Sequence, residues 1–202
     1  MISKTDKMRQ IKDEILNLTT SPLYQYRVEN GFKPVVGEGS YKAEIIFIGE
    51  APGKKEALTG GPFCGASGKV LDTMLASINL KRTDVYITNI VKDRPPENRD
   101  PTSAEIDLYT PFLTRQIDII KPKIIVTLGR FAMSFILSQY SDRPSKKTIT
   151  DLHGKKIKIK TSFGSLILIP FYHPAASIYN QKLKTVLKTD FLKLKKLINN
   201  YD

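Results

Sequence analysis

Four short parts of the sequence carry side chains that can bind or act on a ligand, and the first is a tight turn. Residues 49–53 read Gly-Glu-Ala-Pro-Gly, so that glycine and proline surround the carboxylate of Glu50. Turns of this composition expose backbone amides that a ligand can approach closely. The ordinary alternative is a strand-to-helix turn without a ligand. A phosphate-binding loop is excluded, because Phe63 stands where that motif needs glycine and Val70 where it needs serine or threonine.

The other three side chains suit recognition of a nucleobase. Phe63 lies in a glycine-bounded loop at residues 61–65, where a ring can stack on a base or simply belong to the core. The amide of Asn89 offers one donor and one acceptor, which match a pyrimidine edge or cap a turn. His173, fixed by the following proline, can donate to a carbonyl oxygen that gains negative charge, or make a structural hydrogen bond. We assign no role to His153.

Most of these residues directly follow a segment that we expect to be a strand. Four short apolar runs lack strict alternation, as is typical of parallel strands buried on both faces: Glu44 to Ile48, Val85 to Thr88, Lys123 to Leu128, and Ser165 to Phe171. The turn at 49–53, Asn89, Gly129-Arg130 and His173 each follow one run. Ligands of such sheets bind outside the carboxyl ends of the strands. We therefore expect these groups to converge on one edge.

Helical patterns lie between the runs. Apolar stripes at helical spacing extend from Val70 to Ile78, from Ile106 to Ile120, from Phe131 to Ile136, and from Leu183 to Leu197. Thr102 and Glu105 have the spacing of a capping box, and Lys155 to Lys160 alternates lysine with isoleucine like a hairpin strand. The alternation of strands and helices predicts an α/β protein, a three-layer α/β/α sandwich around a central four-stranded, mainly parallel sheet. One domain over residues 1–202 is the simplest interpretation.

Composition narrows the class of protein. The formal charge of +12 and pI near 9.6 favour a polyanionic partner, or reflect a solvated lysine-rich surface. The single cysteine, Cys64, excludes a disulfide framework and an all-cysteine metal site within one chain. No run approaches the ~20 apolar residues that span a bilayer, and the N-terminus lacks an apolar signal core. We expect an intracellular, cytoplasmic protein that does not enter a membrane.

Five motifs occur in order along the chain. They are Gly49-Glu50-Ala51-Pro52-Gly53, Gly61-Pro62-Phe63-Cys64-Gly65-x-x-Gly68, Asn89-Ile90-Val91-Lys92, Arg94-Pro95-Pro96-x-Asn98-Arg99-Asp100-Pro101 and His173-Pro174-Ala175-Ala176. Each is weak alone, but five at compatible spacing are specific. With them the sequence resembles the family 4 uracil-DNA glycosylases, over nearly the whole chain from about Ser21 to the last helix.

The resemblance implies roles for particular residues. Glu50 and His173 would be catalytic, the first in the motif that positions water and the second in contact with O2 of uracil. Phe63 would stack on uracil and Asn89 would read its edge. The residues implied in substrate binding are Gly49, Ala51, Phe63 and Asn89. The segment from Pro174 to Asn180 resembles the loop that enters DNA where the base leaves, which implies DNA contacts by Pro174, Ala175, Ser177 and Ile178, with Ile178 as the wedge.

The sequence departs from the family at four positions. Family 4 enzymes usually carry a [4Fe-4S] cluster on four cysteines, and the corresponding positions here are Leu18, Ser21, Asp93 and Tyr109. None of these side chains replaces a thiolate, and Cys64 lies in the implied uracil loop instead. We therefore expect no cluster, no metal and no other cofactor, and an N-terminal segment anchored by packing and hydrogen bonds.

The implied activity is that of a monofunctional uracil-DNA glycosylase. It would flip uracil out of DNA and hydrolyse its N-glycosidic bond, leaving an abasic site for base-excision repair. The partner would be uracil-containing DNA, single- or double-stranded, and the protein a monomer. Two alternatives stay open: a catalytically weak or inactive protein on the same fold that binds uracil or abasic DNA, and a glycosylase for another deaminated base.

Overall fold

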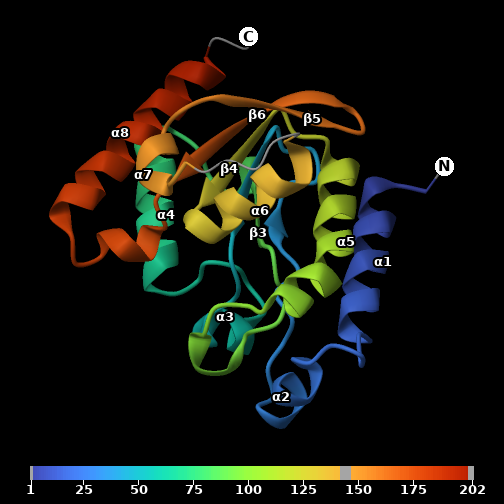
Figure 1. The fold of residues 1–202 in the computed structure, drawn as a ribbon. Coiled ribbons are helices and arrows are strands. Elements are labelled where there is room, and N and C mark those ends of the chain that lie inside the picture. Colours follow the sequence, from blue (N-terminus) through green and yellow to red (C-terminus); the bar gives the residue numbers. More distant parts are fainter. Residues whose placement is uncertain (1, 142–146, 200–202) are drawn as a thin grey trace.

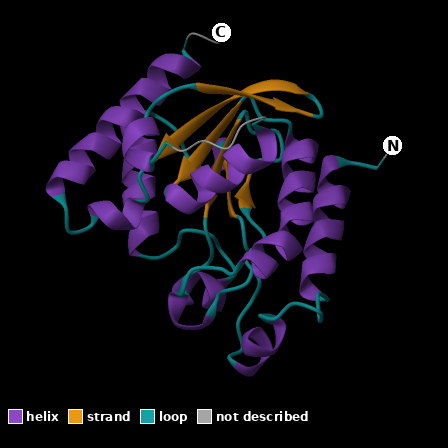
Figure 2. Ribbon diagram, in the orientation of Figure 1, coloured by secondary structure: helices purple, strands orange, loops and turns teal. Residues whose placement is uncertain are grey.

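The computed structural model describes residues 2–141 and 147–199, and its centre is a six-stranded sheet (Figures 1 and 2). The strands lie in the order β1-β3-β2-β4-β6-β5. Their bounds are β1 Glu38–Gly39, β2 Ile45–Gly49, β3 Tyr86–Asn89, β4 Ile124–Leu128, β5 Ile157–Thr161 and β6 Gly164–Phe171. The four central strands, β3, β2, β4 and β6, are parallel, as the sequence predicts.

The two edge strands make the sheet larger than the predicted four-stranded one. Strand β5 pairs with β6 in an antiparallel hairpin, which confirms the interpretation of the alternating lysine and isoleucine residues. Strand β1 pairs antiparallel with β3 through two residues only. So short a strand has no period of its own, because alternation needs at least four residues to be visible.

Helices connect the strands and cover the sheet. The α-helices are α1 Lys4–Leu16, α2 Tyr24–Glu29, α3 Lys54–Thr59, α4 Ala66–Ser77, α5 Ser103–Ile120, α6 Arg130–Tyr140, α7 Ile149–Leu152 and α8 Gln181–Ile198. The described residues also form three short 3-10 helices, η1 Arg82–Asp84, η2 Pro96–Asn98 and η3 Pro174–Ser177. The predicted capping box begins α5, since Thr102 Oγ1 accepts from the Glu105 amide at 3.2 Å and the Glu105 carboxylate accepts from the Thr102 amide at 2.8 Å.

Both faces of the sheet are buried, which gives the predicted three layers. Ile46 and Ile48 of β2 pack with α1, α5 and α6 on one face. Ile45 and Phe47 of the same strand pack with α4 and α8 on the other. Because every residue of such a strand meets a helix, the apolar runs are continuous instead of alternating. Within the described residues, no helix combines the length and the apolar character that crossing a membrane would require.

Candidate active site

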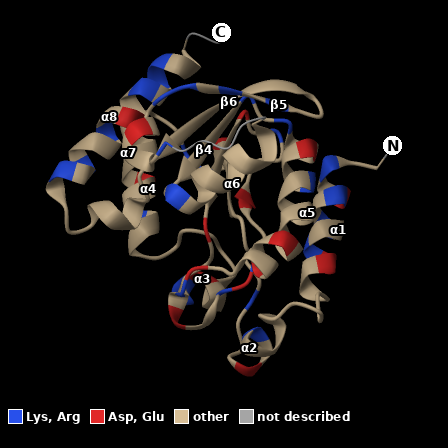
Figure 3. Ribbon diagram, in the orientation of Figure 1, with Lys and Arg blue, Asp and Glu red and all other residues tan. Residues whose placement is uncertain are grey.

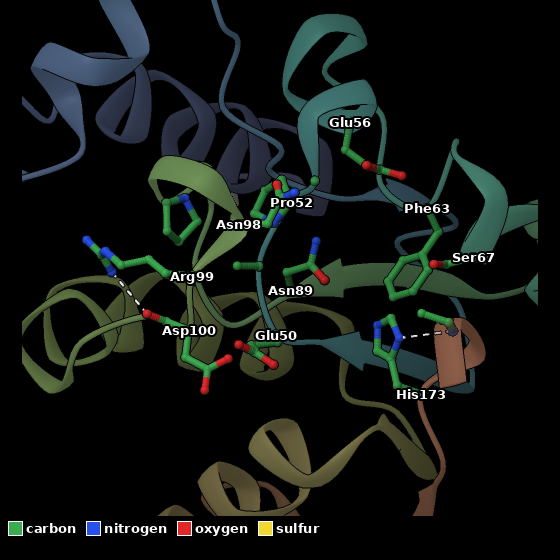
Figure 4. A pocket seen from close by; sticks show the side chains of 14 residues that line it. Glu50, Pro52, Glu56, Phe63, Ser67, Asn89, Asn98, Arg99, Asp100 and His173 are labelled. Atoms are coloured by element: carbon green, nitrogen blue, oxygen red, sulfur yellow. Dashed lines mark hydrogen bonds between the residues drawn. The ribbon is translucent and has the colours of Figure 1, made fainter. Parts of the chain in front are cut away.

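A cavity of about 400 Å³ lies at the carboxyl ends of the parallel strands. Its lining includes Glu50, which follows β2, Asn89 at the end of β3, His173, which follows β6, and Phe63 from the loop before α4. Figure 4 shows these four side chains around one space. The structure therefore brings together the four residues that the sequence singles out. Ala51 and Ala175 also line the cavity.

Strand pairing fixes two of these residues side by side. Gly49 and Asn89 are partners in the register of β2 and β3. The pairing continues beyond the strands, because the Ile90 amide donates to the Gly49 carbonyl and the Val91 amide donates to the Glu50 carbonyl, each at 3.0 Å. The Gly-Glu turn and the segment after Asn89 thus form one rigid wall of the cavity.

Gly49 allows Phe63 and Asn89 to approach the end of β2. A Cβ atom at position 49 would lie 2.3 Å from Asn89 Oδ1 and 2.7 Å from Phe63 Cζ, which are distances that no real side chain tolerates. Beyond Phe63, the ring of His173 follows with its centroid 5.7 Å away and its plane tilted by 34°. Glycine at this position is therefore a condition for the ring and the amide to face the same space.

His173 is held as a neutral imidazole with a defined tautomer. The Ala175 amide donates to its Nδ1 at 3.1 Å, so that Nδ1 is the acceptor and Nε2 carries the proton. Burial lowers the pKa of His173 to about 4, although the charge of Glu56 acts in the opposite direction. Figure 4 shows the second ring nitrogen on the side of the cavity. His173 can consequently donate one hydrogen bond from Nε2 to a ligand at neutral pH.

The amide of Asn89 is almost completely buried, with 2% of the residue exposed. In the described part of the chain, its side-chain oxygen and nitrogen have no hydrogen-bond partner. Both atoms reach the solvent of the cavity, since Thr127 Oγ1 is the one buried side-chain polar atom without a partner in the described residues. A ligand with complementary groups could therefore replace that solvent and pair with the amide.

Glu50 is half-buried, and it changes charge near neutral pH. Its pKa is raised to about 7, first by burial and then by the negative charge of Asp100, while the charge of Arg130 acts in the opposite direction. Arg130 also lies 3.5 Å from the Asp100 carboxylate, so that the three charges form one group at the cavity. A carboxyl group with a pKa near 7 is suited to hold water and accept its proton.

Three other cavity residues carry charges to which the sequence assigns no role. Asp100 and Arg99 belong to the motif at residues 94–101. The presence of a carboxylate in that motif could have identified Asp100 as a candidate site residue. Glu56 lies in the first turn of α3, and its Oε1 accepts from the amides of Cys64 and Gly65 at 3.1 and 2.9 Å. Sequence spacing gives no sign of that contact, because a carboxylate in a first turn is ordinarily a cap.

The loop that was expected to contact DNA divides into buried and exposed residues. Pro174 and Ser177 are buried, and the Ser177 hydroxyl donates to the Pro174 carbonyl at 2.8 Å. The expected DNA contacts of these two residues stay a prediction, and their buried side chains leave the backbone of the loop to make them. Ile178 is 36% exposed, and Tyr179, to which no motif assigns a role, is 98% exposed.

Residues 36–196 match the family model of the uracil DNA glycosylase superfamily. The chain belongs to this superfamily. It is 46% identical over 193 residues to a type-4 uracil-DNA glycosylase of Sulfurisphaera tokodaii, across 95% of this chain and 85% of the relative. Type-4 uracil-DNA glycosylases of Archaeoglobus fulgidus and Saccharolobus solfataricus are 47% and 41% identical, across 81% and 96% of this chain and 81% and 88% of theirs.

In this uracil DNA glycosylase superfamily member, the positions of the implied cluster ligands hold a hydrogen-bonded network. Tyr109 donates to Asp93 Oδ2 at 2.5 Å, and its oxygen lies 3.0 Å from the Ser21 hydroxyl. Arg27 Nη1 donates to both Asp93 oxygens at 3.2 and 3.1 Å. Burial raises the pKa of Asp93, while Tyr109 and Arg27 lower it. We call Ser21, Arg27, Asp93 and Tyr109 the N-terminal junction.

The N-terminal junction does not fit an iron-sulfur cluster. None of its residues is a thiolate, and each polar group already has a protein partner. Leu18, at the fourth position, packs against the core. Arg27 also donates to the carbonyls of Ile15 and Leu16 at 3.1 and 2.7 Å, which attaches the end of α1 to the segment after β3. Packing and hydrogen bonds thus anchor the N-terminal segment, as the sequence predicts.

Proposed function

We propose that this protein is a monofunctional uracil-DNA glycosylase, which extrudes uracil from DNA and hydrolyses its N-glycosidic bond to leave an abasic site. The observation that carries the proposal is the shared cavity of Glu50, Phe63, Asn89 and His173. Membership of the superfamily and similarity to type-4 uracil-DNA glycosylases support it.

Recognition of uracil follows from the hydrogen-bonding groups in the cavity. The Asn89 amide can accept from N3–H of uracil and donate to O4, while His173 Nε2 donates to O2. Phe63 supplies a face for stacking, which is worth about 1–3 kcal/mol per base. Cytosine reverses the donor and acceptor that Asn89 reads, at a cost of about 1–3 kcal/mol for each unsatisfied group. The site therefore prefers uracil to cytosine.

The chemistry follows from the charges around the same space. The bond between sugar C1′ and uracil N1 breaks with both electrons leaving on the base, and the N–H of neutral His173 stabilises the negative charge at O2. Water then adds its oxygen to C1′, and ionised Glu50 accepts the proton. The described cavity lining contains no lysine that could form a Schiff base with the sugar, so water is the nucleophile.

The exposed part of the loop after β6 contributes the contacts to DNA. Ala175 at the cavity and Ile178 beside it would replace the extruded nucleotide, with Ile178 as the wedge. Lysines and arginines on α8, β5 and the start of α6 provide positive charge for phosphates (Figure 3). We extend the proposal to a monomer of one domain over residues 1–202, which acts in the cytoplasm on uracil in single- or double-stranded DNA.

Release of free base from defined oligonucleotides tests the proposal. Single- and double-stranded substrates would carry one uracil, hypoxanthine, cytosine or thymine, and chromatography would quantify the freed base. We expect free uracil and an abasic strand, with His173→Ala protein purified in parallel as the control for contaminating glycosylases. Tight binding of uracil DNA without release of any base would support the inactive binding protein. Release of hypoxanthine in preference to uracil would support the other alternative.

A further inference from the structure

The backbone at Phe63 has a conformation that phenylalanine rarely adopts. Its φ is +49°, in the left-handed region, where a side chain other than glycine is strained. Helix α4, which follows the loop, packs closely against the same residue. A Cβ atom at Gly68 of this helix would lie 1.6 Å from the Phe63 carbonyl oxygen. Surrounding groups must therefore hold the Phe63 backbone in place if the ring is to face the cavity.

Two charged side chains bind the backbone of this loop, one through its amide groups and the other through its carbonyl groups. The Glu56 carboxylate accepts from the amides after Phe63, as described above. Arg82, in η1 before β3, donates from Nη2 to the Pro62 carbonyl at 2.9 Å and to the Phe63 carbonyl at 2.8 Å. Its Nη1 donates to Pro62 again at 3.2 Å. The guanidinium thus binds two consecutive carbonyls of the loop.

Arg82 is itself oriented from a third direction. Its Nε donates to Asp72 Oδ1 of helix α4 at 2.9 Å, and its side chain is 24% exposed. Arg82 is not among the residues that line the cavity. A lysine has one nitrogen and cannot bind both carbonyls and the carboxylate in the planar arrangement that arginine offers. The side chain therefore acts on the cavity only through the backbone of Phe63.

We propose that Arg82 is a positioning residue that fixes the Phe63 ring for stacking on the extruded uracil. This inference rests on the proposed function, because the ring needs a base to stack on. Arg82 holds the left-handed turn at Phe63, and Asp72 holds Arg82. The consequence is specific: loss of Arg82 weakens binding of the base itself while leaving contacts to undamaged DNA unchanged.

A double-mutant cycle on base binding tests the inference. The inhibition constant of free uracil would be measured for the wild type, Arg82→Ala, Arg82→Lys, Phe63→Ala and the double variant Arg82→Ala/Phe63→Ala. We expect Arg82→Ala and Arg82→Lys each to raise this constant about tenfold, as befits loss of charge-assisted hydrogen bonds. In the Phe63→Ala background the same change should add less than about twofold, because no ring is left to position.

The control variant is Arg115→Ala, which removes an ion pair with Glu14 that joins α1 to α5 away from the cavity. It should leave the inhibition constant unchanged. Thermal unfolding and the affinity for undamaged duplex would be measured for every variant to separate positioning from a general loss of structure.

Each result decides the matter. Effects of Arg82→Ala and Phe63→Ala that multiply in the double variant would overturn the inference, and so would an unchanged inhibition constant in Arg82→Ala when Phe63→Ala impairs binding. In both cases uracil release by the wild type would leave the proposed function standing. A wild type that releases no uracil and is not inhibited by it would remove both.

Discussion

Two clusters of polar residues lie close together along the chain and differ in whether their polar groups have partners in the protein. The N-terminal junction contains Asp93, and the cavity contains Asn89, four residues earlier. Each polar group of the junction has a protein partner, such as Tyr109 or Arg27 for Asp93. In the cavity, the Asn89 amide and His173 Nε2 have no partner within the described residues.

This difference separates a structural cluster from a binding site. Burial of polar groups is tolerated when they satisfy each other, and it costs free energy when they do not. The junction stabilises the attachment of α1 and α2, whereas the polar groups of the cavity face its solvent and stay available for a ligand. Substitutions in the first should therefore change stability and those in the second should change activity.

The largest expected effect on stability is at the junction. Arg27→Met would leave Asp93 buried without its cation and free the carbonyls at the end of α1, which should cost about 3–5 kcal/mol of unfolding free energy. Urea unfolding measures this loss. The matched control is Arg9→Ala, whose exposed pair with Asp6 is screened by solvent and should change the unfolding free energy far less. Equal losses in the two variants would contradict the special role of the junction.

The largest effect on activity is expected at His173. Replacement by alanine removes the N–H that stabilises the leaving base, and the single-turnover rate of uracil release should fall about 10²–10³-fold. The affinity for undamaged duplex should stay within about twofold of the wild-type value. The midpoint of urea unfolding should equal that of the wild type within the error of the method. A fall in DNA affinity as large as the fall in rate would show that His173 binds DNA and does not act on the base.

A smaller effect is expected at Asn89, where recognition rather than chemistry is lost. Asn89→Ala should weaken the inhibition by free uracil by about 1–3 kcal/mol and reduce the preference for uracil over cytosine. Because the native amide has no partner to lose, the protein should unfold no more easily than the wild type. If the variant were less stable but bound uracil as well as the wild type, Asn89 would have a structural role and not a role in recognition.

The smallest effects concern Glu50 and depend on pH. Its pKa of about 7 predicts that kcat/KM rises between pH 6 and pH 8 as the carboxyl group ionises, and that Glu50→Gln removes this inflection. His173, whose pKa is lowered to about 4, stays neutral over the same range and adds no second inflection. An unchanged pH profile in Glu50→Gln would exclude Glu50 as the ionising group.

The same substitution should also change stability in a pH-dependent way. In the unfolded chain Glu50 ionises around its ordinary value of 4.5, whereas in the fold it stays protonated up to about 7. Ionisation of the buried carboxyl therefore opposes folding, with no effect below 4.5 and the full effect above 7. Glu50→Gln should raise the stability at pH 8 by about 1 kcal/mol, a value reduced for solvent screening, and should not raise it at pH 4.5. Thermal unfolding at the two pH values measures the difference.

The sequence predicted the parts of the fold that depend on burial. The four parallel strands appear as continuous apolar runs because helices cover both faces, and the motif residues follow these runs at one edge. Strand β1 is too short for such a pattern. The inward orientation of the Ser177 side chain was not predicted, because the resemblance identifies a loop but not which of its side chains turn inward.

The sequence could not predict which side chains bind backbone groups of the site. Arg82 and Glu56 contact the carbonyls and amides around Phe63, and such contacts depend on a chain path that residue type and spacing do not reveal. The junction was predicted only in part: the missing cysteines excluded a cluster, but the role of Arg27 required the position of α2 beside the end of α1.

A crystal structure with free uracil tests the central claim most directly, since that claim assigns the unpaired groups of the cavity to one base. We expect uracil stacked on Phe63, with N3 and O4 within about 3.2 Å of the Asn89 amide and O2 at the same distance from His173 Nε2. Uracil bound elsewhere, or a cavity in which Asn89 and His173 stay unpaired beside the ligand, would contradict the account.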